Sequence, residues 1–151
     1  MRIAVIGGGR ITDTETEYET ARAVGRLLAT RGHEIVCGGL GGVMEAACRG
    51  GSDAGGHTIG ILPGTDRDGA NEYVETVITT GMGNARNVLV VLNSDAVIAI
   101  DGATGTLSEI GHALDYDRPV AGIDTHDLAE LTGFESVETP EEAVTSVERR
   151  V

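Results

Sequence analysis

Short apolar segments of strand length alternate along this chain with amphipathic segments of helix length. The apolar runs cover residues 2–6, 34–37, 58–62, 74–78, 96–100 and 119–123, and the helix-like stretches lie near 15–31, 43–49, 84–93 and 107–116. Strands that are apolar along their length indicate a parallel sheet with helices on both faces. The order predicts an α/β fold: a Rossmann-like three-layer sandwich with a mostly parallel sheet, in a single domain over residues 1–151.

Charge and composition limit the classes of partner. The 151 residues carry 24 acidic and 11 basic side chains, a net charge of −13, and every basic residue is arginine. The absence of lysine excludes Schiff-base chemistry, pyridoxal phosphate attachment and a Walker-type phosphate site. The acidic excess argues against binding to nucleic acid or anionic membranes, and no apolar run is long enough to span a bilayer. The carboxylate-rich composition is typical of salt-adapted proteins.

The two cysteines, Cys37 and Cys48, are too few for a disulfide scaffold or a four-thiolate zinc site. The first residues read as a strand rather than an export signal, so a cytoplasmic protein is expected. For Cys37, a buried structural thiol is favoured over a reactive one.

Glycine is concentrated where predicted strands end. The chain has 23 glycines, and three apolar runs lead directly into glycine-rich turns at 7–9, 38–42 and 102–106. In parallel sheets these carboxyl ends carry the ligand site, and helix N-termini offer free N–H groups to an anion. The alternative is that the glycines only allow tight turns. We expect a phosphate site formed by Gly8, Gly9, Gly38, Gly39, Gly41, Gly42, Met44, Gly102, Thr104, Gly105 and Thr106.

Two of these turns resemble a known family. The segment CGGLGGVME at 37–45 resembles the GGGxxGLMG motif of the LOG family, long mislabelled lysine decarboxylase-like, and DGATGTLSE at 101–109 resembles its PGGxGTxxE motif. The resemblance covers roughly residues 2–123 and looks closest to a short prokaryotic branch similar to molybdenum-cofactor carrier proteins; residues 124–151 match nothing recognisable. It implies a Rossmann-like fold, a homodimer or higher homo-oligomer, and a phosphorylated small-molecule ligand.

The hydrolytic members of that family cleave the N-glycosidic bond of nucleoside 5′-monophosphates. Their essential Arg and Glu correspond by position to Arg86 and Glu109. A carboxylate there stabilises an oxocarbenium-like sugar and activates water, while an arginine holds the phosphate or orients the carboxylate. The sequence departs from the family pattern at Cys37, Glu45, Asn87, Asp101, Ala103 and Ser108, which weakens the case for hydrolysis more than the case for binding. An acid at Asp101 is unfavourable beside a phosphate unless it points away.

Plainer roles remain open for the same residues. Thr106 and Glu109 fit a capping box, in which the glutamate only bonds back to the start of its helix. Arg86 could be a surface ion-pair partner, and Arg10, which could reach a phosphate, could equally be solvated. Glu109 and His112 have the spacing of a di-iron ligand pair, but no second copy exists, so no metal site is expected.

The sequence therefore predicts a carrier or sensor of a phosphorylated, nucleotide-like ligand. That ligand is a nucleoside monophosphate or molybdopterin, and no cofactor is required. The alternative is a phosphoribohydrolase acting on nucleoside 5′-monophosphates, with Arg86 and Glu109 as catalytic residues. A purely structural module has no sequence feature in its favour.

Overall fold

Seven strands form one sheet in the computed structural model, which describes all of residues 1–151. The strands are β1 (Arg2–Gly7), β2 (Glu34–Cys37), β3 (Thr58–Leu62), β4 (Thr76–Thr79), β5 (Ala96–Ile100), β6 (Val120–Ile123) and β7 (Phe134–Ser136). Their spatial order is β4-β3-β2-β1-β5-β6-β7, and every neighbouring pair is parallel. Strands β2, β3 and β4 therefore lie on one side of β1, and β5, β6 and β7 lie on the other. The direction in which strands are added reverses between β1 and β5.

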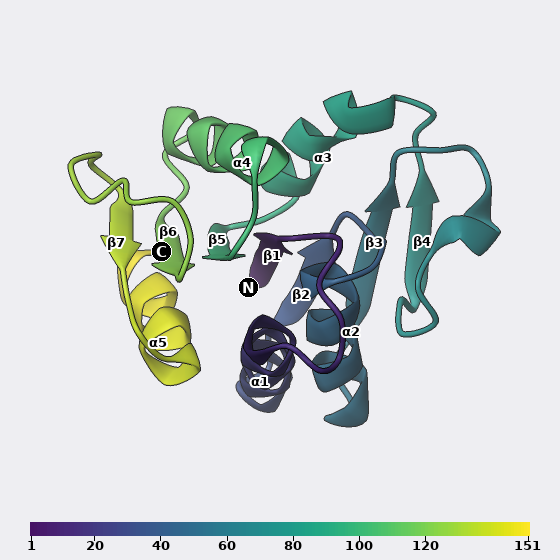
Figure 1. The fold of residues 1–151 in the computed structure, drawn as a ribbon, viewed down its shortest axis with the longest axis horizontal. Coiled ribbons are helices and arrows are strands. Elements are labelled where there is room, and N and C mark those ends of the chain that lie inside the picture. Colours follow the sequence, from purple (N-terminus) through teal and green to yellow (C-terminus); the bar gives the residue numbers. More distant parts are fainter.

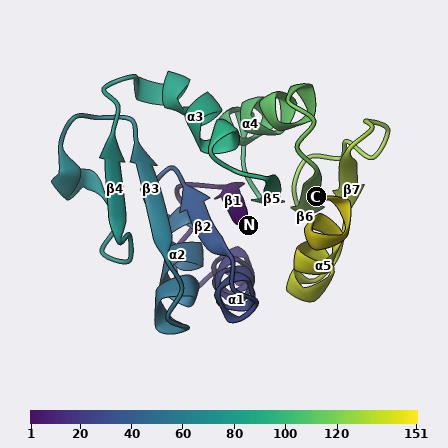
Figure 2. The same ribbon diagram turned by 180° about the vertical axis from the view of Figure 1, so that it is seen from behind.

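Five helices cover the two faces of the sheet, as Figures 1 and 2 show from opposite sides. They are α1 (Thr16–Thr30), α2 (Val43–Asp53), α3 (Asn87–Leu92), α4 (Thr104–Asp115) and α5 (Pro140–Arg150). Helices α1, α2 and α5 pack on one face, in a cluster that includes Ile3, Val5 and Ile98. Helices α3 and α4 pack on the other face, against Ala4, Ile6 and Val97. Alternate residues of one strand face opposite layers, as the period of two requires, which confirms the predicted three-layer sandwich.

Several boundaries differ from the sequence prediction for local physical reasons. The fourth strand begins at Thr76 instead of residue 74, because the preceding residues form a turn in which the Val74 N–H donates to the Asn71 carbonyl. Helix α4 begins at Thr104, three residues earlier than predicted. The 84–93 stretch divides into a 3₁₀ turn (Gly83–Arg86) and helix α3, and a second 3₁₀ turn (Arg67–Gly69) interrupts the expected loop at 65–72.

The C-terminal region adds a strand and a helix to the sheet. Strand β7 pairs with β6 and was not predicted, since three residues are too few to show a period. Thr139 caps the start of α5: its side chain accepts a hydrogen bond from the Glu142 N–H, while the Glu142 carboxylate accepts one from the Thr139 N–H.

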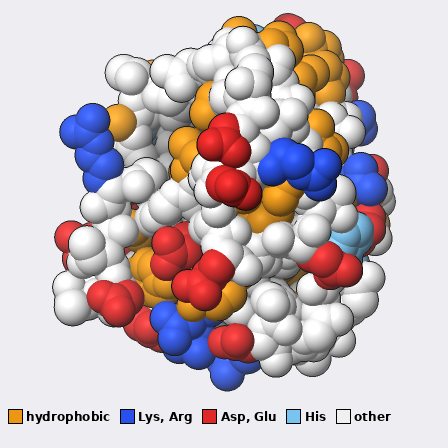
Figure 3. Space-filling model, turned by 90° about the vertical axis from the view of Figure 1, so that its right-hand side faces the viewer, with side chains coloured by type: hydrophobic (Ala, Val, Ile, Leu, Met, Phe, Trp, Pro, Cys, Tyr) orange, Lys and Arg blue, Asp and Glu red, His pale blue; other side chains and the backbone are white.

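The surface mixes acidic, basic and apolar groups. Figure 3 shows carboxylates and arginines interspersed on the face beside β4. No helix combines the length and the apolar character that crossing a bilayer would demand.

Candidate functional site

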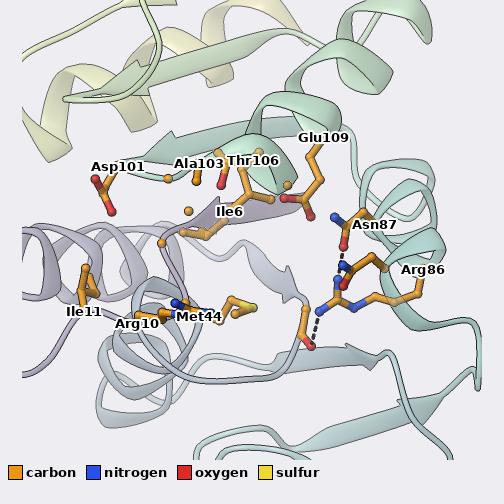
Figure 4. Close-up of a pocket in the computed structure, with 18 of the residues that line it drawn as sticks. Ile6, Arg10, Ile11, Met44, Arg86, Asn87, Asp101, Ala103, Thr106 and Glu109 are labelled. Atoms are coloured by element: carbon orange, nitrogen blue, oxygen red, sulfur yellow. Dashed lines mark hydrogen bonds between the residues drawn. The ribbon is translucent and has the colours of Figure 1, made fainter.

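A cavity of about 700 Å³ lies at the carboxyl ends of β1 and β5, where the strand order reverses. This volume falls in the usual range for small-molecule sites, which in open α/β sheets occur at this position. Its lining comes from four stretches of sequence that the fold brings together: residues 5–15, 38–44, 84–87 and 101–109. Figure 4 shows these side chains around the cavity.

The first glycine turn allows the two central strands to approach each other closely. A Cβ on Gly7 would lie 1.9 Å from the Ile100 carbonyl oxygen, and one on Gly8 would lie 2.3 Å from a carboxylate oxygen of Asp101. Gly8 and Gly9 both line the cavity, as does Arg10 directly after them. The turn therefore supplies backbone atoms to the lining of the cavity.

The second glycine turn contributes less to the lining than expected. Gly38 and Met44 line the cavity, whereas Gly39, Gly41 and Gly42 do not. Gly39 packs against Leu62 of β3, and a Cβ on Gly42 would lie 2.1 Å from the Gly8 carbonyl oxygen. The structure therefore places these three glycines outside the lining: Gly39 packs against β3, while Gly41 and Gly42 allow the second turn to approach the first.

The third turn presents the start of α4 to the cavity. Ala103 is the N-cap residue and no side chain caps the helix, so the N–H groups of its first turn have no partner within the helix. Gly102, Gly105 and Thr106 line the cavity, whereas Thr104 does not. The helix points its partial positive charge at this space, which favours an anion there.

Arg86 is buried beside the second turn. Its guanidinium donates to the Gly38 carbonyl oxygen at 3.3 Å and to the Asn87 side-chain oxygen, and its Nε has no partner. Only 6% of the residue is exposed and it forms no ion pair, so the surface ion-pair interpretation is wrong. Burial lowers the pKa of Arg86, an effect that Glu109 and Cys37 oppose.

Glu109 is buried on α4 at the same end of the cavity. It is 7% exposed, and its carboxyl group makes no hydrogen bond within the chain. Burial raises its pKa to about 8, and the nearby Arg86 charge opposes that rise. The capping-box interpretation is wrong, because α4 begins at Thr104 and Glu109 lies in its second turn.

Cys37 is the last residue of β2 and directly precedes Gly38. It is fully buried, its sulfur accepts the Gly39 N–H at 3.3 Å, and the Cys48 sulfur lies 3.5 Å away. The hydrogen bond from Cys48 lowers the pKa of Cys37, and the Gly39 N–H and the Arg86 charge lower it further. The predicted burial of this thiol is confirmed.

Several lining residues were not among the predicted site residues: Arg10, Ile11, Glu15, Asn84, Asn87 and Asp101. Five of them have as their only sequence signal a position near a glycine turn or Arg86, and Glu15 has none. Asp101, which we expected to be unfavourable beside a phosphate unless it points away, lines the cavity with its carboxylate against Gly8.

Comparison with known proteins shows two kinds of relative. Residues 1–150 match the SLOG cluster4 family, which extends the likeness beyond residue 123. An uncharacterized protein of Archaeoglobus fulgidus is 46% identical, over 95% of this chain and 92% of its own length. A cytokinin riboside 5′-monophosphate phosphoribohydrolase of Mycobacterium tuberculosis is 32% identical over 70% of this chain. The chain spans 62% of the length of that enzyme.

Two solved structures have nearly the same fold throughout. The molybdenum cofactor binding protein of Rippkaea orientalis has a TM-score of 0.89 and 36% identity, with 98% of this chain and 95% of the other covered. The molybdenum cofactor carrier protein of Chlamydomonas reinhardtii has a TM-score of 0.88 and 30% identity, with 98% and 96% covered.

Proposed function

Because the chain belongs to the SLOG cluster4 family of the LOG-like superfamily, we propose that its cavity binds a phosphorylated, nucleotide-like small molecule. The protein acts as a carrier or sensor of that molecule. A nucleoside monophosphate and molybdopterin both fit this description, since each joins a phosphate monoester to a polar heterocycle. The likeness to proteins named as molybdenum cofactor binders supports the second, and the likeness to a phosphoribohydrolase supports the first.

The observation that carries the proposal is the Arg86 guanidinium, buried at the cavity without an anionic partner. A buried charge is costly unless it is paired, and here the Nε lacks even a hydrogen bond. The uncapped start of α4 faces the same cavity with Gly105 and Thr106. A phosphate between them would meet backbone N–H groups on one side and the guanidinium on the other, which compensates both.

Glu109 then faces the remainder of the ligand. With a pKa of about 8 its carboxyl group is largely protonated at neutral pH, so it can donate to a sugar hydroxyl or a ring oxygen without repelling the phosphate. In the proposed complex the phosphate lies at residues 102–106, and the sugar or ring system extends toward Glu109.

Binding is tested by calorimetry with a panel of nucleoside 5′-monophosphates and by native mass spectrometry of the purified protein for a retained pterin or nucleotide. We expect binding that falls at least tenfold in Arg86→Ala, because a bidentate charged contact is lost. Arg67→Ala is the matched control, since Arg67 is exposed and outside the cavity. Binding that survives unchanged in Arg86→Ala, or no binding and no retained ligand, would refute the proposal.

One observation favours hydrolysis as a second function. A carboxyl group with a pKa near 8 is suited to giving a proton to a departing base at neutral pH. In that reaction the N-glycosidic bond breaks as the base takes the Glu109 proton, the oxygen of water bonds to the anomeric carbon, and the proton that the water loses returns to the Glu109 carboxylate. Incubation with nucleoside monophosphates and chromatography for free base decides between the two functions: release that is abolished in Glu109→Ala establishes the enzyme, and binding without release supports the carrier.

A further inference from the structure

Asp101 brings an unpaired negative charge to the cavity. It follows β5 directly and lines the cavity, and its carboxylate contacts neither an arginine nor a hydrogen-bond donor of the chain. The side chain lies against Gly8, because a Cβ added there would be 2.3 Å from its Oδ2 atom. In Figure 4, Ala103 and Thr106 lie between Asp101 and Glu109, so the two acids mark opposite ends of the site.

The backbone holds Asp101 firmly in this position. Its φ is +53°, a left-handed conformation that aspartate and asparagine tolerate better than most residues. The Thr125 hydroxyl donates to its carbonyl oxygen at 2.6 Å, and its own N–H donates to the Ile123 carbonyl oxygen at 3.3 Å. The turn therefore fixes the backbone from which the carboxylate extends toward Gly8.

A metal ion does not account for this acid. Nowhere in the structure do three His, Cys, Asp or Glu side chains come close enough together to hold one. The only cation on the same side of the lining is Arg10, which is exposed and forms no ion pair with Asp101. The charge of Asp101 therefore acts directly on whatever occupies the cavity.

We propose that Asp101 is a specificity-determining residue that restricts the ligand to a single phosphate group. The inference rests on the proposed function, in which the phosphate lies at residues 102–106 and the sugar or ring points toward Glu109. A second phosphoryl group must then extend the other way, toward Asp101 and Gly8. Two like charges a few ångströms apart in a partly enclosed site reduce affinity by about tenfold or more. A nucleoside mono- and diphosphate differ only in the second phosphoryl group, so the Asp101 carboxylate lowers the affinity for the diphosphate relative to the monophosphate.

The substitution Asp101→Asn tests the charge without disturbing the turn, since asparagine has the same shape and also adopts left-handed backbone. Asp117→Asn is the matched control, because Asp117 has a φ of +55° but lies outside the cavity. The measurements are calorimetry with paired nucleoside 5′-mono- and diphosphates, and thermal stabilisation by inorganic phosphate and pyrophosphate as probes that carry no base.

We expect the unmodified protein to prefer the singly phosphorylated member of each pair by about tenfold or more, and Asp101→Asn to remove most of that preference. Asp117→Asn should retain it, and added salt should weaken it. An unchanged preference in Asp101→Asn, with monophosphate binding intact, overturns the inference and leaves the proposed function standing. A protein that responds to no monophosphate and not to inorganic phosphate overturns both.

Discussion

Glu109 and Arg86 line one end of the same cavity without forming an ion pair. The charged form of each group nevertheless reduces the cost of burying the other. Burial raises the pKa of the glutamate and lowers that of the arginine, and the opposite partner reduces both shifts. Two buried, incompletely paired polar groups are costly to a folded chain. Their position at the switch point of the sheet supports the proposed ligand site, because a bound ligand would supply the hydrogen-bond and charge partners that the two groups lack.

Glu109→Gln should stabilise the protein at alkaline pH. The pKa of the Glu109 carboxyl group is about 8 in the folded state, against an ordinary value of 4.5. The group therefore contributes fully to stability below pH 4.5, and this contribution is lost as pH rises from 4.5 to 8. Within this window the free energy of unfolding of the unmodified protein should fall relative to the variant by about 1.4 kcal/mol per pH unit. Urea unfolding at pH 5, 6.5 and 8 measures the difference.

The exposed Glu130→Gln is the control for that experiment and should show no such trend. Comparison with the variant also removes the contribution of Glu34, Glu135 and Glu148, whose lowered pKa values act in the opposite sense and at lower pH. A constant difference between Glu109→Gln and the unmodified protein across the range would show that the Glu109 carboxyl group is solvated.

Ligand affinity should decline above about pH 8, where Glu109 becomes ionised. A phosphate monoester is already a dianion above pH of about 6, so the new charge repels it and the dissociation constant rises by up to about tenfold per pH unit. Calorimetry between pH 6.5 and 9.5 checks this. Glu109→Gln should give a flat profile over the same range, and a parallel decline in both proteins would assign it to another group.

Arg86→Met should separate binding from folding. The side chains have comparable length, and Glu109, with a pKa of about 8, is left protonated rather than as an uncompensated carboxylate at neutral pH, so we expect the free energy of unfolding to fall by no more than about 2 kcal/mol for the lost hydrogen bonds. Ligand binding should nevertheless be lost. Thermal unfolding with and without ligand measures both. A variant that fails to fold would show that the guanidinium's bonds to Gly38 and Asn87 hold the second turn in place.

Gly42→Ala should destabilise the protein by about 2 kcal/mol or more. Gly42 has a φ of +66°, and its Cβ would lie 2.1 Å from the Gly8 carbonyl oxygen, so the first and second turns would be forced apart. Gly69→Ala is the control, because nothing lies within 4 Å of a Cβ there. Equal midpoints of urea unfolding for the two variants would contradict the close approach of the turns.

Most of the fold follows from the sequence because the strands are buried on both sides. Runs such as the five residues of β3 and of β5 are apolar enough to be recognised with correct bounds. Strand β7 could not be recognised, since its pairing with β6 depends on a neighbour that the local sequence does not specify. The start of α4 was misjudged because Thr106 has the residue type of a cap, yet the helix begins at Thr104 with no side-chain cap.

The candidate site was predictable as a location and less so in its details. Glycines after three strands correctly indicate which edge of the sheet is hollow. They do not reveal which of them face the cavity: Gly38 does, whereas Gly42 serves the contact between two loops. That distinction depends on how closely β1 and α2 approach. Asp101 was likewise visible in the sequence, but its backbone conformation is a left-handed turn held by hydrogen bonds to Ile123, at the end of β6, and to Thr125, just after it.

The cavity wall is drawn from stretches that begin near residue 5 and end at residue 109, on both sides of the central strand. A fragment that lacks either side of the central strand loses part of the wall, so occupancy and global unfolding are thermodynamically linked. At a free ligand concentration one hundred times its dissociation constant, the filled protein gains about 2.7 kcal/mol against unfolding. Resistance to a protease that cleaves only unfolded chains therefore reports how full the cavity is, even before the chemical identity of its occupant is established.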